Sequence, residues 1–446
     1  MGLFEFFKRL FFGSPAPDVT SSAGSASAPH SSPTPAAPAK STPRRRRKRV
    51  PGQSSRPPVQ LRSLRYRSTL VQTPRQQEQV PTKPYAFAVR DFDAYLDLSQ
   101  DADPRWLEYY GLPALRTPQD LANWLGIPVG RLAWLTQQHL PDRRPASPKE
   151  AHYHYQWKQK RSGGYRLIEA PKELLKTVQT QILREILDRV PPHPAAHGFV
   201  EGRSIVTNAR PHLGQRFILK FDLENFYPSV RYSRVVGIFR SLGFSREVAI
   251  WLARLTTTAV PQEFRSPDSR PGWHWSMSTY RSHHLPQGAP TSPALANLSA
   301  YALDVRLSGL AKAYHVTYTR YADDLTFSGA PRTVPALGEV IQLTEKIVRS
   351  ERFRLHPRKR KVLRNNQRQV VTGVVVNDRL NISRKEFDQL KATLHNCIKL
   401  GPASQNRAEH PEFAAHLRGR IAHVRQLNAL RGDKLMALFQ RINWNR

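Results

Sequence analysis

The sequence predicts an α+β fold preceded by a disordered basic arm, and three observations support this prediction. Two stretches of strand-forming residues, 154–171 and 316–328, each contain a short glycine or polar break and therefore indicate β-hairpins. Several longer segments carry apolar residues at helical spacing. Residues 14–84 are rich in Ser, Ala, Pro and Gln and hold too few large apolar side chains to offset the entropy of an ordered chain.

The charge of the chain indicates a polyanionic partner. Its 446 residues include 69 Lys and Arg but only 34 Asp and Glu, which gives a formal net charge of +35. Nucleic acid is the usual partner of so basic a protein, and solubility alone is served better by acidic residues. The single cysteine, Cys397, excludes an intramolecular disulfide and a multi-cysteine zinc site. No apolar run is long enough to span a membrane, so we expect a cytoplasmic protein.

The first 84 residues combine two features. Apolar residues between positions 3 and 11 fall on one side of a helix, which predicts a short amphipathic helix that binds a partner or a membrane surface. Within the arm, the basic run at residues 44–49 adds sequence-independent affinity for phosphates. Taken alone, such a run is equally typical of a solvated surface.

Ordered structure is expected from about residue 85. Residues 117–126 predict a helix, with Thr117 as the N-cap, a proline at the first helical position and Gly126 at the end. Residues 127–135 predict a second helix. Small helical pairs of this kind often carry no chemistry, so a structural role is the default interpretation.

The predicted hairpin at residues 154–171 is basic. Lys158, Lys160 and Arg166 suit triphosphate oxygens, because arginine offers a bidentate fork and lysine a point charge. A basic hairpin taken alone is more often a solvated surface. The amphipathic segment 174–187 then predicts a helix.

Three aspartates form the candidate catalytic centre. Asp323 and Asp324 lie side by side in the break of the second hairpin, and Asp222 ends an apolar run that predicts a buried strand. Neighbouring carboxylates repel one another unless a cation lies between them, and Mg²⁺ prefers carboxylate oxygens together with substrate phosphates. Two-metal phosphoryl transfer needs a third carboxylate of this kind. By itself, an Asp-Asp pair is more often a turn or surface feature.

Two further stretches lie between these aspartates. Tyr227 is placed either to pack against the sugar of a bound nucleotide or to join the core, which is the commoner fate of aromatic residues. Residues 285–293 form a loop in which Gly288 permits close backbone approach and Gln287 can contact a nucleotide. Residues 294–307 predict the helix that follows. By composition alone, the 285–293 stretch is a loop and nothing more.

The order of these blocks resembles that of reverse transcriptases. A basic hairpin, an Asp followed by an aromatic residue, Leu-Pro-Gln-Gly and Tyr-Ala-Asp-Asp succeed one another between residues 153 and 380. The resemblance implies a right-hand polymerase fold with fingers, an antiparallel-sheet palm and a helical thumb. The implied boundaries are 1–84 for the N-terminal helix and arm, 85–220 for the N-terminal helices and fingers, 221–380 for the palm and 381–446 for the thumb.

The same resemblance implies roles for the matching residues. Asp222, Asp323 and Asp324 match the catalytic metal ligands, and Leu223 matches the residue whose backbone carbonyl binds one metal. The implied cofactor is a pair of Mg²⁺ ions, for which Mn²⁺ can substitute. Tyr227 matches the residue that crowds a ribose 2′-hydroxyl and so favours dNTPs. The residues that match dNTP contacts are Lys158, Lys160, Arg166, Tyr227, Gln287, Gly288 and Lys359.

Two short motifs resemble those of retron reverse transcriptases, Asn208-Ala-Arg-Pro-His212 before the palm aspartates and Val371-Thr372-Gly373 after them. The residues with implied RNA contacts are Asn208, His212, Val371, Thr372 and Gly373. In that family, DNA synthesis starts on the 2′-hydroxyl of a guanosine in a structured non-coding RNA, which also serves as the template. The product is a small branched RNA–DNA. Many retrons act in defence against phage with an effector, which we expect here to be a separate protein.

Two other functions compete with this interpretation. Another bacterial reverse transcriptase, of the group II intron or diversity-generating type, would share the palm motifs, but intron-encoded enzymes usually carry further domains beyond the thumb. A non-catalytic RNA-binding module would keep the fold, but it has no need of three mutually repelling acids. The basic, helix-prone segment 384–446 is expected to bind RNA by shape and phosphate contacts. We therefore expect a retron reverse transcriptase.

Overall fold

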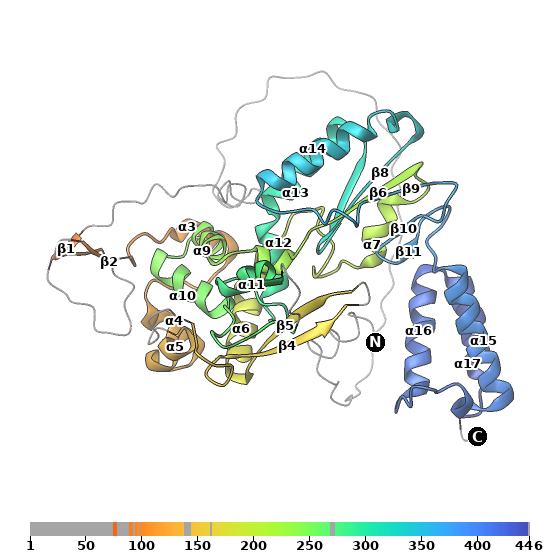
Figure 1. The fold of residues 1–446 in the computed structure, drawn as a ribbon, viewed down its shortest axis with the longest axis horizontal. Helices are drawn as coiled ribbons and strands as arrows, with labels where there is room; N and C mark the ends of the chain where they lie inside the picture. Colours follow the sequence, from red (N-terminus) through yellow and green to blue (C-terminus); the bar gives the residue numbers. More distant parts are fainter. Residues whose placement is uncertain are drawn as a thin grey trace, which may run out of the picture. The chain divides into compact units, whose positions relative to one another are not determined.

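The computed structural model describes residues 98–137, 144–160, 163–267 and 273–444, together with three short N-terminal strands (Figure 1). These strands are β1 (Arg75–Gln77), β2 (Val89–Asp91) and β3 (Ala94–Leu96), and they form an antiparallel sheet in the order β1-β3-β2. Strand β1 falls within the segment for which the sequence predicts disorder. The predicted amphipathic helix at residues 3–11 and the basic run at 44–49 lie outside the described residues.

Three short helices follow: α3 (Pro104–Tyr110), α4 (Pro118–Leu125) and α5 (Val129–Leu135). The side chain of Thr117 accepts a hydrogen bond from the Asp120 N–H, and the Asp120 carboxylate accepts one from the Thr117 N–H, which completes a capping box. Gly126 ends α4 in the left-handed conformation, with φ 67°. The two helices predicted between residues 117 and 135 are therefore confirmed.

The first predicted hairpin is also confirmed. Strands β4 (Tyr153–Gln159) and β5 (Tyr165–Pro171) pair antiparallel along their whole length. The Lys160 N–H donates to the Gly164 carbonyl at 2.9 Å and closes the turn between them. Helix α6 (Glu173–Glu185) follows and buries Leu175, Val178 and Ile182, as its helical spacing predicts.

A four-stranded antiparallel sheet carries the predicted aspartates. Its strands are β6 (Phe217–Asp222), β7 (Thr317–Tyr321), β8 (Asp324–Gly329) and β9 (Lys361–Arg364), in the order β7-β8-β6-β9. Strand β6 is central because it pairs with β8 on one side and β9 on the other. Phe217, Leu219 and Phe327 are buried almost completely and fix the sheet in the main core. The second hairpin and the buried strand that leads to Asp222 are thereby confirmed.

Further helices pack around this core. They are α7 (Ile205–Ala209), α8 (Phe226–Ser229), α9 (Tyr232–Ser241), α10 (Arg246–Thr256), α11 (Trp273–Arg281), α12 (Ser292–Ser299), α13 (Tyr301–Ala313) and α14 (Leu337–Ser350). Figure 1 shows α13 and α14 side by side. The helix predicted at residues 294–307 is interrupted, because Ala300 leaves helical geometry (φ −86°, ψ 2°) between α12 and α13.

The C-terminal part contains a small hairpin and three helices. These are β10 (Val370–Val371), β11 (Val374–Val375), α15 (Arg384–Leu400), α16 (Phe413–Leu427) and α17 (Ala429–Gln440). The three helices share a core of their own, in which Leu394, Ile421 and Leu435 are fully buried. In the described part of the chain, none of the helices combines the length and the apolar character needed to cross a membrane.

Candidate active site

The three predicted aspartates lie at one end of the four-stranded sheet. The β7–β8 hairpin turns through Ala322 and Asp323, and Ala322 takes the left-handed conformation with φ 54°. Asp324 begins β8 directly opposite Asp222, the last residue of β6. The Leu223 N–H donates to the carbonyl of Asp323 at 2.9 Å. The sheet thus brings together carboxylates that are far apart in the sequence.

Lys359 contacts Asp222 at this site. Its Nζ atom lies 2.8 Å from both carboxylate oxygens of Asp222, and the two side chains are 47% and 13% exposed. Within the described residues, no group of three or more His, Cys, Asp or Glu side chains is already arranged as a metal cage. Carboxylate oxygens are nevertheless the donors that a hard divalent cation prefers. A cation that binds Asp222 would have to displace the Lys359 ammonium.

Burial makes the paired aspartates costly to ionise. It raises the pKa of Asp323 to about 6, and the charges of Asp324 and Asp222 add to this shift. Burial also raises the pKa of Asp324, although the Lys220 ammonium acts in the opposite direction. A divalent cation between these carboxylates would offset both the burial and the repulsion. The charge balance of the site therefore fits a divalent metal.

We expect the Asp323→Asn substitution to stabilise the metal-free protein at neutral pH. The pKa of this carboxyl rises from 3.8 to about 6 on folding, so the folded protein holds the proton more tightly. Ionisation then costs stability progressively as the pH rises through this interval, and fully above it. Urea denaturation in EDTA should show a gain of about 1–3 kcal/mol near pH 7.5, shrinking towards zero near pH 4. A gain that does not depend on pH would contradict this explanation.

The basic hairpin is within electrostatic reach of the aspartates. Burial, together with the charges of Arg166 and Lys359, lowers the pKa of Lys160, and the charge of Asp222 opposes that shift. Lys158 lies directly opposite Arg166 in the β4–β5 pair, so their side chains share one face of the hairpin. The structure therefore brings the predicted triphosphate-binding cations towards the predicted metal site.

Tyr227 lies at the edge of the same site. It belongs to α8, which begins after Asn225 in the left-handed conformation (φ 48°). Its ring packs on that of Phe226, with the centroids 5.7 Å apart. Burial raises the pKa of Tyr227, and the charge of Asp323 raises it further. Phe226 takes the buried core position, so Tyr227 is the aromatic residue left beside the carboxylates.

The loop that contains Gln287 and Gly288 is joined to strand β5. The Glu169 N–H donates to the Gln287 carbonyl at 3.0 Å. A Cβ added at Gly288, which has φ 140°, would lie only 2.9 Å from the Glu169 carbonyl oxygen. The Glu169 and His284 side chains are fully buried and meet at 3.1 Å, between Oε2 and Nε2. Glu169 and His284 are 115 residues apart in the sequence, so no local pattern predicts their contact.

The two short motifs around the palm aspartates contact each other. The Asn208 Nδ2 donates to the Thr372 Oγ1 at 3.4 Å, and the Thr372 hydroxyl donates to the Ile205 carbonyl at 3.3 Å. Thr372 and Gly373 both take left-handed backbone conformations, with φ 47° and 86°, as a two-residue type I′ turn requires. The first motif thus supports the turn that the second motif forms between β10 and β11.

The burial of these motif residues bears on their predicted RNA contacts. The His212 side chain is fully buried, with Nδ1 2.7 Å from Ser328 Oγ and Nε2 2.8 Å from Thr319 Oγ1, so it joins β7 to β8. Asn208 and Val371 are also fully buried. The exposed residues of the two motifs are Arg210, Pro211 and Gly373, and Thr372 is half-buried. Direct RNA contact by the buried side chains remains a prediction.

Gly198 packs against the aspartate turn. Next to it, the His197 N–H donates to the Arg320 carbonyl and the Arg320 N–H donates to the Ala195 carbonyl, both at 2.7 Å. Through these two hydrogen bonds, the loop at residues 195–198 runs parallel to β7. A Cβ added at Gly198 would lie 2.6 Å from the backbone nitrogen of Ala322. The sequence contains no local signal for this contact.

We expect Gly198→Ala to disturb the turn and lower DNA synthesis. The added methyl group meets backbone atoms, which cannot rotate away, so overpacking should cost about 1–3 kcal/mol of stability. A displaced turn should also reduce the rate by about tenfold or more. Thermal unfolding and primer extension would measure both effects. The matched control is Gly309→Ala on α13, where an added Cβ has no atom within 4 Å. Equal activity of the two variants would contradict the prediction.

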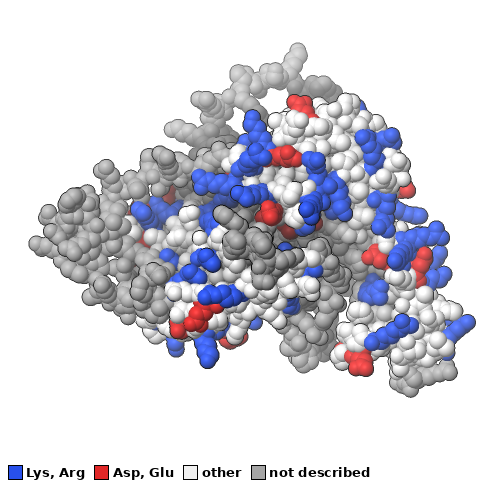
Figure 2. All heavy atoms as spheres, viewed as in Figure 1, with Lys and Arg blue, Asp and Glu red and all other residues white. Residues whose placement is uncertain are grey.

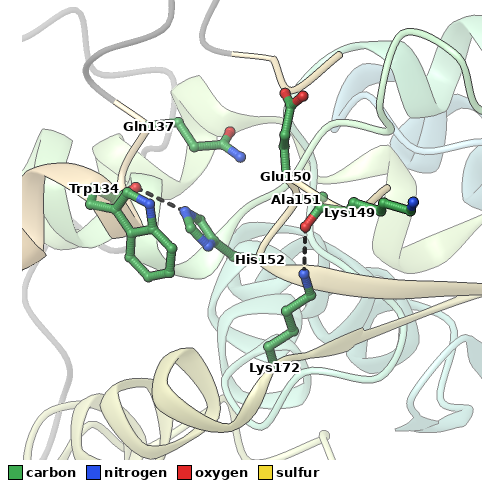
Figure 3. Close-up of a pocket in the computed structure, with 7 residues that line it drawn as sticks. All are labelled: Trp134, Gln137, Lys149, Glu150, Ala151, His152 and Lys172. Atoms are coloured by element: carbon green, nitrogen blue, oxygen red, sulfur yellow. Dashed lines mark hydrogen bonds between the residues drawn. The ribbon is translucent and has the colours of Figure 1, made fainter. Parts of the chain in front are cut away.

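A separate cavity of about 250 Å³ lies between α5 and the base of the β4–β5 hairpin. Figure 3 shows the Trp134 and His152 rings side by side, with the Gln137 side chain close to them. The Lys172 Nζ donates to the Lys149 carbonyl at 2.9 Å. None of the residues that line this cavity belongs to the predicted site.

The surface is strongly basic in the view of Figure 2, where Lys and Arg side chains are spread across the described surface and fewer Asp and Glu lie among them. On strand β9 and the loop before it, exposed cations succeed one another; they are Arg358, Lys359, Arg360, Lys361 and Arg364. A surface of this kind favours binding to nucleic acid phosphates.

Comparisons with known proteins agree with this geometry. Residues 158–389 match the family model described as reverse transcriptase (RNA-dependent DNA polymerase). The chain is 42% identical over 341 residues to the retron Mx65 reverse transcriptase of Myxococcus xanthus, covering 75% of this chain and 73% of that protein. It is 31% identical over 278 residues to the retron Ec86 reverse transcriptase of Escherichia coli, covering 62% and 76% of the two chains. With its aspartates at the end of a reverse transcriptase sheet, this chain belongs to the retron reverse transcriptases and is an RNA-directed DNA polymerase.

Proposed function

We propose that this enzyme starts a DNA chain on the 2′-hydroxyl of a guanosine in a structured non-coding RNA and copies the same RNA into a small branched RNA–DNA, the msDNA. The observation that carries the proposal is the contact between Asn208 and Thr372, which joins two retron-type motifs beside a complete set of palm aspartates. A reverse transcriptase of another type would need the aspartates but not this pair of motifs.

Asp222, Asp323 and Asp324, together with the backbone carbonyl of Leu223, would hold the metal ions. The proposed ions are two Mg²⁺, for which Mn²⁺ can substitute; when bound, they supply charge neutralisation at the attacking and leaving oxygens. The reaction forms a bond between the primer oxygen and the α-phosphorus of a dNTP, and it breaks the bond to pyrophosphate.

The cations of the basic hairpin and Lys359 are the proposed partners of the triphosphate. Lys158, Lys160 and Arg166 come from one hairpin whose charges interact with the site, which supports a shared ligand. Lys359 contacts Asp222 directly. Its release on metal binding would place a free ammonium beside the leaving phosphates, where negative charge develops.

Three further residues are proposed to shape the nucleotide site. The Tyr227 ring would lie under the sugar and leave no room for a ribose 2′-hydroxyl. Gln287 and Gly288 would contact the nucleotide from the loop that is bound to β5. The hydrogen bond between Glu169 and Gln287 couples this loop to the hairpin that carries Arg166.

The proposed arrangement is a right hand, with fingers at residues 85–220, palm at 221–380 and thumb at 381–446. The thumb helices and the Thr372-Gly373 turn are the proposed RNA-binding surfaces. The buried Asn208 would hold the turn through its hydrogen bond to Thr372, and the buried His212 would hold β7 and β8 together. The basic charge of the described surface supports phosphate contacts of this kind.

The experiment that tests the proposal examines nucleic acid from cells that carry the native locus. The intact enzyme is compared with the double variant Asp323→Asn, Asp324→Asn, and RNase-treated samples are examined for a discrete small DNA. We expect a band only with the intact enzyme, and its mobility should change on debranching. A band that resists debranching would overturn the 2′-hydroxyl primer. RNA that is still bound without any DNA would favour the binding-module alternative.

A role in defence against phage, together with a separate effector protein, is part of the same proposal. It predicts that plating efficiency of a sensitive phage falls when the intact locus is present and recovers with the double aspartate variant. Equal plating with the intact and the variant locus, across a phage panel, would remove this part of the proposal and leave the polymerase unaffected.

A further inference from the structure

We propose that Arg320 is a positioning residue that holds the Asp323–Asp324 turn in its metal-binding geometry, through a buried ion pair with Asp304. This inference rests on the proposed metal site. Neither Arg320 nor Asp304 belongs to the motifs that relate the sequence to reverse transcriptases. Arg320 lies on β7 just before the turn, and Asp304 lies on helix α13.

The ion pair is fully buried and bidentate. Both side chains are 0% exposed, and the Arg320 Nη2 lies 2.6 Å from Asp304 Oδ2. The Arg320 Nε lies 2.8 Å from Asp304 Oδ1. The hydroxyl of Tyr318 also donates to Asp304 Oδ1, at 2.8 Å. The carboxylate is thereby fixed by two residues of the strand that leads into the turn.

The remaining donors of Arg320 hold the turn itself. Its Nη1 donates to the backbone carbonyl of Ala322 at 3.0 Å and to Asn297 Oδ1 at 2.9 Å. The Asn297 amide in turn donates to the Gly198 carbonyl at 2.9 Å. Gly198 is the residue whose missing side chain lets the loop press against Ala322. One guanidinium therefore connects the turn to both helix α12 and the loop that packs against it.

The turn needs such support for two physical reasons. Ala322 takes a left-handed conformation that non-glycine residues adopt only when their surroundings impose it. The two aspartates that follow are partly buried and repel each other, so a turn that is free to relax would move their carboxylates apart. A fixed spacing of the oxygens is what the binding of paired metal ions requires.

A buried ion pair is weak evidence for stabilisation, because removing two charges from water costs about as much as their attraction returns. An apolar pair of similar size would fill the same space. Arginine is needed for a different reason, since only its planar fork can reach Asp304, Asn297 and the Ala322 carbonyl at once. The position of the donors therefore favours a role in geometry over a role in stability.

The test compares three variants of the full-length enzyme bound to its RNA. Arg320→Lys keeps the positive charge but removes the planar guanidinium and its set of N–H donors. The double variant Arg320→Met, Asp304→Leu removes both charges and keeps the volume apolar. The control is Arg306→Lys, also on α13, whose partner Glu351 lies 2.7 Å away and does not contact the turn. The measurements are Mn²⁺ affinity by electron paramagnetic resonance, the Mg²⁺ dependence of primer extension, and thermal unfolding without metal.

We expect Arg320→Lys and the double variant to bind Mn²⁺ about tenfold more weakly and to need correspondingly more Mg²⁺ for half-maximal rate. The double variant should unfold near the wild-type temperature, and Arg306→Lys should bind Mn²⁺ as the wild type does. Wild-type affinity in a double variant of wild-type stability would overturn the inference. If the double variant does not fold, the Arg320→Lys variant provides the test. Wild-type Mn²⁺ affinity of Arg320→Lys would then overturn the inference. A wild-type enzyme that binds no Mn²⁺ would instead overturn the proposed metal site.

Discussion

Replacing Asp324 by Asn should reduce DNA synthesis by about 10³-fold or more, because the loss of this proposed metal ligand would remove several kcal/mol of transition-state stabilisation. The same result is expected for Asp222→Asn, since the two residues face each other at the ends of β6 and β8. Single-turnover primer extension at saturating dNTP is the measurement. RNA affinity should stay near that of the wild type. The aspartates are negatively charged, as the RNA phosphates are, so replacing one of them removes no favourable contact with the RNA.

The control for this prediction is Asp188→Asn, which removes an exposed carboxylate paired with Arg184 and should leave the rate unchanged. A rate within about tenfold of the wild type for either palm variant would show that the carboxylate is not a metal ligand. A loss of RNA binding together with activity would indicate a disturbed fold.

Replacing Tyr227 by Val should let the enzyme incorporate ribonucleotides. The ring would no longer occupy the space of the 2′-hydroxyl, so the preference for dNTPs over rNTPs should fall by on the order of 10²-fold. The ratio of kcat/KM for dGTP and GTP on one template is the measurement. The rate with dNTPs should fall much less than that ratio, because Tyr227 is not one of the proposed metal ligands.

The matched control is Tyr227→Phe, which keeps the ring and removes only the hydroxyl. We expect it to retain the preference for dNTPs, since the ring blocks the sugar. If Phe and Val relaxed the preference equally, the tyrosine hydroxyl would be the discriminating group. If neither changed it, the ring would belong to the core, as its contact with Phe226 also allows.

Local signals were sufficient to predict much of this fold. The capping residues Thr117 and Gly126 mark the ends of α4 because their effects act within one turn of helix. The strand that ends at Asp222 is recognisable because a buried strand must be apolar. The hairpin β4–β5 follows from two glycines between strand-forming runs. In each case, the residues that determine the structure are neighbours in the chain.

The support of the active site could not be predicted in this way, because it depends on contacts between distant segments. Asp304 occurs in a helical run, where a carboxylate is usually exposed, and only the packing of β7 buries it against Arg320. His212 belongs to a motif that implied RNA contact, yet its ring is enclosed between Thr319 and Ser328. Burial of a polar residue depends on partners that the local sequence does not name.

The order of strands in the catalytic sheet has a consequence for synthesis of the enzyme on the ribosome. Strand β6 leaves the exit tunnel long before β8 and β9, the two strands that flank it in the sheet. At about 5–20 residues per second, the delay between Asp222 and Gly329, the last residue of β8, is roughly 5 to 21 seconds. During that time the apolar strand has no partner on either edge, which makes the nascent chain prone to aggregation. Its production in a heterologous host should therefore benefit from slow expression and from chaperones that shield unpaired strands.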